Sequence, residues 1–434
     1  MKKIYKSFLE NLNIFLLLII IIVGGIFGDY ITASILFVIT VILKKKNITE
    51  FLLVMTLITF LLADNFKGPL GFFQNLRFVI VMVNLIYLLK HNLLKNNYGN
   101  YMFPFAILAL IISIFYSPIG IQSYLRAIAF WLIPLIIFRL ISISHKNSAR
   151  RTSELIVLIF TSYIGFNLVF YFFPIIDVFL VGRYKGLAGN PNALGLIMMF
   201  MYGLLQLIQK RNETSFSDLL FLMLKISCLV LIILTGSRNA LISAIIFTIF
   251  YKFFFNKRLF IITLLGLIFF YFVISSLNFQ QLIISLGLSD QLRLDSFGDA
   301  SGRTEVWVVV WEEIKNSFWF GGGLLYDDYI IKEYVTNYFG STFPRHWAGV
   351  WNSYLSLLLD VGLVGTLVYL IFWIKIFKKS KFLNLSAAFT IMCFLSGITE
   401  SWMAASMNSF TPMMFLFWAI ESQPLFKQTN IINL

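Results

Sequence analysis

Four arginines stand in short polar stretches where a guanidinium could bind an anion. Arg183 lies in VGRYKGLAGNPNALG, Arg238 in LTGSRNALIS, Arg303 in DASGRTEVW and Arg345 in STFPRHWAG. A guanidinium stays charged at physiological pH and presents a planar fork of donors that fits phosphate oxygens. Arginines from three separate loops, if they converge, would clamp a diphosphate. The alternative is that they snorkel to lipid phosphates and pair with nearby carboxylates.

The strongest single position is Arg238, because it stands in a short hairpin between two apolar runs. An arginine at a membrane boundary is costly, and its default interpretation is a functional site with an anionic partner. Arg77 and Arg126 lie near the ends of other apolar runs. They either line a cavity or snorkel to the surface, and their positions do not separate the two.

His346 is the histidine that we expect on the outer face of the membrane. His91 and His145 fall in basic loops, which we expect to be cytoplasmic. Histidine exchanges a proton near neutral pH, so it is the natural general base for activating a hydroxyl. The alternative is an interfacial histidine that only anchors its loop.

Other chemistries lack a motif in this sequence. Cys228 and Cys393 fall inside apolar runs, and neither an HExxH nor a closely spaced His/Cys ligand set occurs. Asp327-Asp328 is a weak metal signal, and we expect solvated surface there. The glycines of the Arg183 stretch follow no strand, and no GKS/T tract occurs, so nucleotide-driven chemistry is not indicated. We expect no metal and no cofactor.

The composition is that of a membrane protein. Hydrophobic residues make up 59% of the 434 residues, charged residues make up 12%, and the mean hydropathy is +0.86. The net charge of +14 is spread over short tracts between apolar runs, which argues against a nucleic-acid surface and for topology signals.

The apolar runs predict an all-α polytopic membrane protein with about 12 to 14 transmembrane helices in one domain, residues 1–434. The expected spans are 12–28, 30–43, 51–63, 70–89, 103–116, 121–140, 154–173, 193–209, 219–235, 239–255, 259–276, 351–374, 382–398 and 404–420. Lysines and arginines fall in every second connection, so the positive-inside rule predicts that both termini are cytoplasmic.

Most acidic residues fall in one predicted outer loop, residues 277–350. Loops of that length usually carry function. Within it, Thr304 to Ser317 places Trp307, Trp311 and Ile314 on one helical face, which predicts an amphipathic helix in the outer interface.

The sequence resembles the O-antigen polymerase and O-antigen ligase superfamily. Four stretches carry the resemblance in order: RYKGLAGNPNALG from Arg183, TGSRNAL from Thr235, SGRTEVW from Ser301 with NSFWFGGG following, and NSYLSLLLDVGLVG from Asn352. They cover residues 180–370, and the N-terminal half matches only as a series of hydrophobic spans.

The resemblance implies a metal-independent membrane glycosyltransferase of the GT-C type, with its active site at the outer face of the bacterial inner membrane. Arg183, Arg238 and Arg303 would bind the donor diphosphate, and His346 would position or deprotonate the acceptor hydroxyl. Supporting residues would be Arg345, Asn352, Tyr354, Asn190 and Asn192. In the family a histidine usually precedes the Asn at the helix start, whereas this chain has Trp351 there.

Within the superfamily, we favour a polymerase that joins undecaprenyl-diphosphate-linked repeat units over a ligase that transfers glycan to lipid A core. A lipid-linked oligosaccharide flippase is the alternative from another class. The expected partners are the lipid-linked donor and acceptor, membrane lipid, and a chain-length regulator and flippase of the same pathway, with no nucleic acid.

Overall fold

The computed structural model describes residues 2–44, 47–65, 69–92, 98–174, 176–253, 303–340 and 343–425. In these ranges the chain forms sixteen α-helices and one two-stranded antiparallel ribbon. The predicted fold class, an all-α polytopic membrane protein, is confirmed.

The N-terminal part consists of α1 (Lys2–Glu10), α2 (Leu12–Phe27), α3 (Tyr30–Leu43), α4 (Ile48–Leu62), α5 (Phe73–Lys90), η1 (Tyr98–Met102), α6 (Phe103–Tyr116), α7 (Ile121–Asn147) and α8 (Ala149–Phe172). The rest consists of β1 (Phe179–Leu180), β2 (Arg183–Tyr184), α9 (Pro191–Arg211), α10 (Asp218–Thr235), α11 (Arg238–Phe253), α15 (Arg303–Asn316), α16 (Tyr326–Tyr338), η4 (Arg345–Ala348), α17 (Ser353–Phe377), α18 (Leu383–Gly397), η5 (Trp402–Ala404) and α19 (Phe410–Glu421). Each predicted span coincides with one of these helices, except that 259–276 lies outside the described residues.

By length and composition, seven of the described helices can cross a membrane, and α1 with α2, bent by 65°, makes an eighth. The apolar helices α3, α4, α18 and α19 are shorter. All twelve residues of α19 are buried, and α4 is buried from Thr49 to Leu62. These two helices are enclosed by others, and apolar composition alone does not distinguish an enclosed helix from one that faces lipid. The predicted number of 12 to 14 spans therefore counts helices that fall short of full spanning length.

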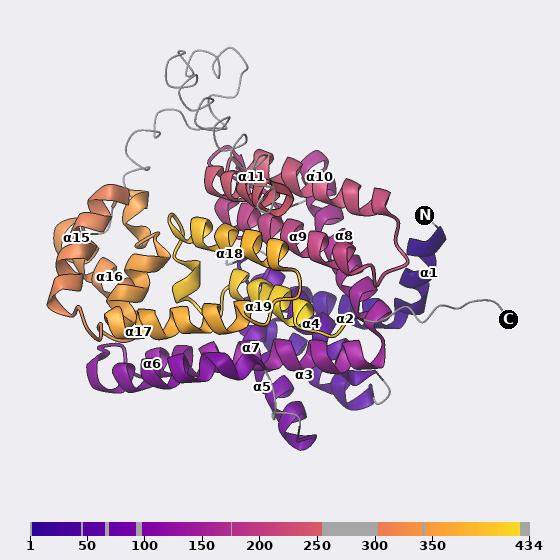
Figure 1. Cartoon of the computed structure of the whole chain (residues 1–434), viewed down its shortest axis with the longest axis horizontal. Helices are drawn as coiled ribbons and strands as arrows, with labels where there is room; N and C mark the ends of the chain where they lie inside the picture. Colours follow the sequence, from indigo (N-terminus) through magenta and orange to yellow (C-terminus); the bar gives the residue numbers. More distant parts are fainter. Residues whose placement is uncertain are drawn as a thin grey trace, which may run out of the picture.

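The bundle has two ends, which α8, α9 and α10 connect. At 1.5 Å per residue these helices are roughly 36, 31 and 27 Å long, close to the thickness of the hydrocarbon core. Figure 1 shows α15 and α16 at one end of the long axis and α1 at the other. We call the first the loop end, which also holds β1 and β2, and the second the α1 end. The predicted topology makes the loop end extracytoplasmic.

Helix α17 is broken at Gly362, and residues Phe318 to Gly323, here called the glycine segment, fill the break. Gly362 has a φ of 63°, and a Cβ added there would lie 2.4 Å from the backbone of Trp319 and Phe320. The bonds across the break are Gly322 N–H to Leu359 O (2.8 Å), Gly323 N–H to Asp360 O (2.8 Å), Leu363 N–H to Phe318 O (2.8 Å) and Val364 N–H to Trp319 O (3.2 Å). The glycine segment thus satisfies backbone groups that a broken helix would leave unpaired.

Helices α15 and α16 pack on the first half of α17. The buried face of α15 is Val306, Val310 and Ile314, all 0% exposed. The predicted helix in this region is present, but the predicted apolar face is wrong in part, because Trp311 is 46% exposed. Apolar residues occupy several sides of α15, so its spacing alone did not determine which stripe packs against α17.

We predict that Gly362→Ala destabilises the protein strongly, because the added methyl group meets backbone that cannot move aside. Gly340→Ala is the matched control: its φ is 69°, but no atom lies within 4 Å of the added Cβ. Backbone strain alone should cost roughly 1–2 kcal/mol at Gly340, and Gly362→Ala should lower the thermal unfolding temperature well beyond that. Equal losses in the two variants would contradict the docking described here.

Candidate functional site

The ribbon before α9 holds Arg183 against the turn after α10. Val181 and Gly182 both have positive φ and form the tight connection between β1 and β2. Arg183 Nε donates to Thr235 O at 2.8 Å, so the RYKGLAGNPNALG stretch contacts the TGSRNAL stretch directly. Gly195 near the start of α9 also lies close to this turn, since a Cβ added there would lie 2.6 Å from Ser237 Cβ.

A chain of polar contacts joins Arg183 to Arg303. Arg183 Nη2 donates to Asn192 Oδ1 at 2.8 Å, and Asn192 Nδ2 donates to Glu400 Oε1 at 2.8 Å. The same Glu400 oxygen lies 3.3 Å from Arg303 Nη2. The structure therefore brings together two of the three predicted diphosphate-binding arginines, through a carboxylate that the sequence reasoning missed. We call Arg183, Asn192, Glu400 and Arg303 the arginine network.

Burial makes the central carboxylate unusual. The side chains of Arg303 and Glu400 are 15% and 13% exposed. Burial raises the pKa of Glu400, while Arg303, Asn192 and Arg183 act in the opposite direction. Arg303 also donates to Thr399 O and lies over the Trp351 ring, 5.4 Å from its centroid. A guanidinium on an indole face gains a cation–π interaction and keeps its full positive charge.

The start of α17 fixes the turn that carries Glu400. Asn352 caps α17 by accepting from the N–H groups of Tyr354 (2.9 Å) and Leu355 (3.1 Å). Its own N–H donates to Ser401 Oγ at 3.1 Å, and Ser353 Oγ donates to Glu400 O at 2.6 Å. Asn352 therefore lies next to the arginine network, and together with Ser353 it fixes the backbone of the turn that carries Glu400.

The other predicted supporting residues have different surroundings. Asn190 caps α9 by accepting from Ala193 N–H at 2.9 Å. The Tyr354 hydroxyl donates to Phe394 O of α18 at 2.7 Å, which joins two helices. Arg345 is the first residue of η4, and its side chain lies outside the described part of the structure.

Arg238 is the partly buried first residue of α11, in the turn that Arg183 contacts. Its neighbour Asn239 donates from Nδ2 to Ser396 O at 2.8 Å, which places this turn beside the end of α18. All three predicted arginines therefore lie at the first residue of β2, α11 or α15, at the loop end.

His346 lies in η4, beside the stacked pair of Arg303 and Trp351. Its Nε2 is 3.3 Å from Glu305 Oε2, and its carbonyl accepts from Trp351 Nε1 at 2.9 Å. The loop thus brings the His346 backbone next to Trp351, the position where the family resemblance predicts a histidine. The His346 imidazole, however, contacts Glu305 on α15. Glu305 is 67% exposed, so this pair is open to solvent.

A second carboxylate, the half-buried Asp64, flanks the site in the turn after α4. Its Oδ2 accepts from Gly189 N–H at 3.2 Å. Burial raises its pKa to about 7, although Gly189 and the charge of Arg77 lower it. Arg77 donates to Met407 O, which places it between Asp64 and the turn that precedes α19.

The expectation that Asp327-Asp328 is solvated surface was wrong for Asp327, which is 6% exposed. Its N–H donates to Asp360 Oδ1 at 3.0 Å, and Leu325 N–H donates to Asp360 Oδ2 at 3.2 Å. Asp360 thus takes the position of an N-cap for α16 from another helix. Burial and Asp328 raise the pKa of Asp327, and the charge of Arg126 lowers it. Among the described residues no group of three or more His, Cys, Asp or Glu side chains could hold a metal ion.

Comparison with known proteins adds one finding. Residues 221–370 match the family model of O-antigen ligase, which confirms the resemblance to the O-antigen polymerase and ligase superfamily. The match begins in α10 and ends within α17, so it includes Arg238, Arg303 and His346 but not Arg183 or Glu400. Among the curated proteins, no relative matches the chain.

We predict that Asp64 makes stability depend on pH. Its folded pKa of about 7 lies above the ordinary value near 4, so the folded state holds the proton more tightly than the unfolded state. The free energy of unfolding should therefore fall as pH rises from about 4 through 7. Thermal unfolding across this range should show the decline in the wild type and a smaller one in Asp64→Asn. The exposed carboxylate of Asp218 offers the control, Asp218→Asn, which should keep the wild-type slope. An Asp64→Asn slope equal to the wild-type slope would contradict the assignment.

Proposed function

We propose, on the premise that residues 221–370 are an O-antigen ligase family domain, that this chain polymerises undecaprenyl-diphosphate-linked oligosaccharide repeat units into O-antigen or a related surface polysaccharide. The family supports glycosyl transfer of the ligase or polymerase type on lipid-linked glycans. The observation that carries the proposal is the arginine network, which holds Arg183 and Arg303 together at the loop end of an apolar helix bundle.

The donor diphosphate would bind at the arginine network. Arg183 and Arg303 are linked through one carboxylate, and Arg238 stands in the turn that Arg183 contacts. Within the arginine network, the two guanidiniums of Arg183 and Arg303 against the one carboxylate of Glu400 leave a formal charge of +1 where a diphosphate would bind. A glycosyl diphosphate departs as an anion, and fixed cations aimed at developing charge stabilise such a transition state.

The transfer step needs a base for the acceptor. The acceptor hydroxyl oxygen attacks the anomeric carbon of the donor, the bond from that carbon to the phosphate oxygen breaks, and undecaprenyl diphosphate leaves with the electron pair. His346 takes the hydroxyl proton, and Glu305 holds the resulting imidazolium through the 3.3 Å contact. The residues of this step need neither a metal nor a nucleotide.

The proposal places the protein in the bacterial inner membrane with the arginine network facing outward and both termini in the cytoplasm. The acceptor is an incoming lipid-linked repeat unit. A chain-length regulator and a flippase of the same pathway are proposed partners.

The ligase reading shares the donor chemistry and differs only in the acceptor, lipid A core. The transporter reading is less supported, because the charged groups of the arginine network lie at one end of the bundle, whereas secondary transporters place such groups near the midplane. The test is purified protein given lipid-linked repeat units alone. Elongated glycan on the lipid supports the polymerase. A ligase would require lipid A core as acceptor, and a transporter would form no new glycosidic bond.

We predict that Arg303→Gln and Arg183→Gln each reduce elongation by a factor on the order of 10² or more, as loss of a charged transition-state contact does. Lys378→Gln is the control, because Lys378 is an exposed cation after α17 and lies outside the arginine network, and it should elongate normally. Normal chain length in both network variants, with the protein folded by thermal unfolding, would refute the diphosphate site.

A separate prediction concerns the base. His346→Ala should lower the elongation rate by a factor of about 10² to 10⁴, the usual contribution of general base catalysis. Donor binding should be unchanged, since His346 is not part of the arginine network. If the variant elongates at the wild-type rate, the proton goes elsewhere, and Glu400 with its raised pKa is the next group to substitute.

A further inference from the structure

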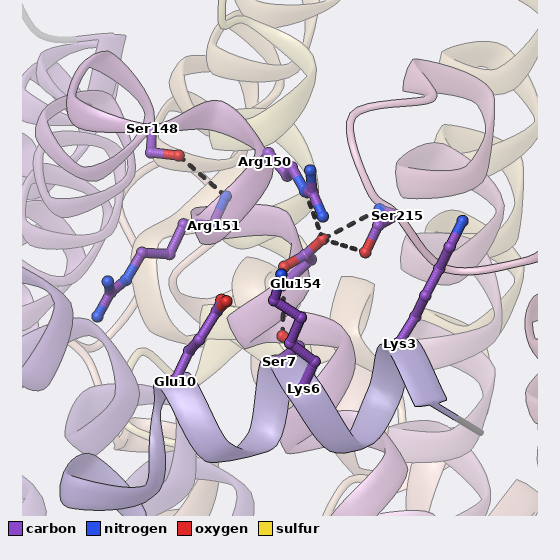
Figure 2. A pocket seen from close by; sticks show the side chains of 9 residues that line it. All are labelled: Lys3, Lys6, Ser7, Glu10, Ser148, Arg150, Arg151, Glu154 and Ser215. Carbon is purple, nitrogen blue, oxygen red and sulfur yellow. Dashed lines mark hydrogen bonds and ion pairs between the residues drawn. The ribbon is translucent and has the colours of Figure 1, made fainter.

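A basic cavity of about 550 Å³ opens at the α1 end, opposite the arginine network. It lies between α1, the first turns of α8 and the connection from α9 to α10 (Figure 2). The charged residues of its lining are Lys3, Lys6, Arg150, Arg151, Glu10 and Glu154. We call it the basic cavity.

Glu154 holds the three walls of the basic cavity together. Its Oε1 accepts from Arg150 Nε (2.9 Å), Ser215 N–H (3.0 Å) and Ser215 Oγ (2.7 Å), and its Oε2 accepts from Ser7 Oγ (3.2 Å). Figure 2 shows these groups meeting between α1 and α8. The hydrogen bonds of this carboxylate are made within the protein, so Glu154 does not need the cavity lysines.

The remaining charge on the walls is positive. Four cations and two carboxylates line the basic cavity, a formal charge of +2. Arg151 also contacts Glu50, with its Nε 2.9 Å from Glu50 Oε2. Lys3 and Lys6 project from α1 on the cavity side and have no ion-pair partner among the residues that the structure describes. Both lysines are exposed and could move to meet an anion.

A second, apolar cavity of about 400 Å³ is lined in part by residues of the same two helices, α1 and α8. Phe8 follows Ser7 on α1 and lines the apolar cavity, whereas Ser7 lines the basic one. On α8 the lining changes from Glu154 to Ile159 and Tyr163, roughly 8 to 14 Å further along the helix axis. The apolar cavity continues between α2, α4 and α8 toward Leu187 near the loop end.

We propose that the two cavities form one site for an anionic glycerophospholipid of the leaflet at the α1 end, with its phosphodiester between Lys3, Lys6 and Arg150 and an acyl chain in the apolar cavity. The order of a basic region followed by an apolar region along α8 matches the order of a phospholipid in its leaflet. Basic pockets between transmembrane helices on the cytoplasmic side recognise such headgroups. The bound lipid would hold α1, which is bent 65° from α2, against the start of α8.

A free phosphate shares the headgroup chemistry but leaves the apolar cavity unused. The test therefore uses the purified full chain in a nonionic detergent and measures its thermal unfolding temperature with four probes. These are dioleoylphosphatidylglycerol, dioleoylphosphatidylcholine, glycerophosphoglycerol, which has no acyl chains, and inorganic phosphate.

The variant is Lys3→Gln/Lys6→Gln, which leaves the Glu154 contacts intact. Its matched control is Lys378→Gln/Lys379→Gln, two exposed lysines after α17. Phosphatidylglycerol should raise the unfolding temperature of the wild type and the control at the same lipid concentration. The double variant should need roughly 25-fold more lipid, since each of the two interfacial lysines contributes about a fivefold factor in affinity.

Three results would overturn the proposal. Equal stabilisation by phosphatidylcholine would mean that the site does not distinguish an anionic headgroup from a zwitterionic one. Equal stabilisation by inorganic phosphate or glycerophosphoglycerol would mean that a free anion occupies the basic cavity. A Lys3→Gln/Lys6→Gln response equal to that of the wild type would remove the two lysines from the site. None of these measurements depends on glycosyl transfer, so they test the lipid site separately from the proposed enzymatic activity.

Discussion

The arrangement at the loop end depends on one carboxylate that links two guanidiniums. Removing an ion from water costs several kcal/mol unless it is paired and hydrogen-bonded. Glu400 contacts Arg303 directly and is connected to Arg183 through Asn192, so one carboxylate is shared by two guanidinium groups. The network is mostly buried yet keeps an excess of positive charge. That excess makes the site suited to an anion of higher charge, and it is the physical reason for assigning the donor diphosphate here.

The network has its geometry because α17 is broken. An unbroken helix would have no place for the glycine segment, and α15 with Arg303 would lose its anchor on α17. Asp360 adds a second attachment by accepting from the backbone N–H groups at the start of α16. The start of α17 fixes the Glu400 turn from the other side through Ser353. The NSFWFGGG and DVGLVG stretches are therefore the two halves of one joint that supports the site.

Helix positions were predictable because the length and composition of an apolar run are local properties, and nearly every expected span coincides with a helix. Convergence of the arginines was only a condition of the diphosphate hypothesis, and the structure links Arg183 to Arg303 through Asn192 and Glu400. Glu400 was missed because a single acid in the turn TESW has no motif, and its partners are remote in sequence. The burial of Asp327 was missed for the same reason, because Asp360 reaches it from another helix. The sequence has more cations than nearby acidic residues at the predicted membrane boundary, and this excess was the signal that could have drawn attention to Glu400.

The central claim is that the arginine network recognises a diphosphate, and its most direct test is a binding measurement. Purified wild-type protein and Arg303→Gln would be titrated with undecaprenyl diphosphate and with undecaprenyl monophosphate, which share the same tail. The account predicts that the wild type binds the diphosphate more tightly and that Arg303→Gln loses this preference while still binding both lipids through the tail. Equal affinities of the wild type for the two lipids, or an unchanged preference in Arg303→Gln, would contradict it.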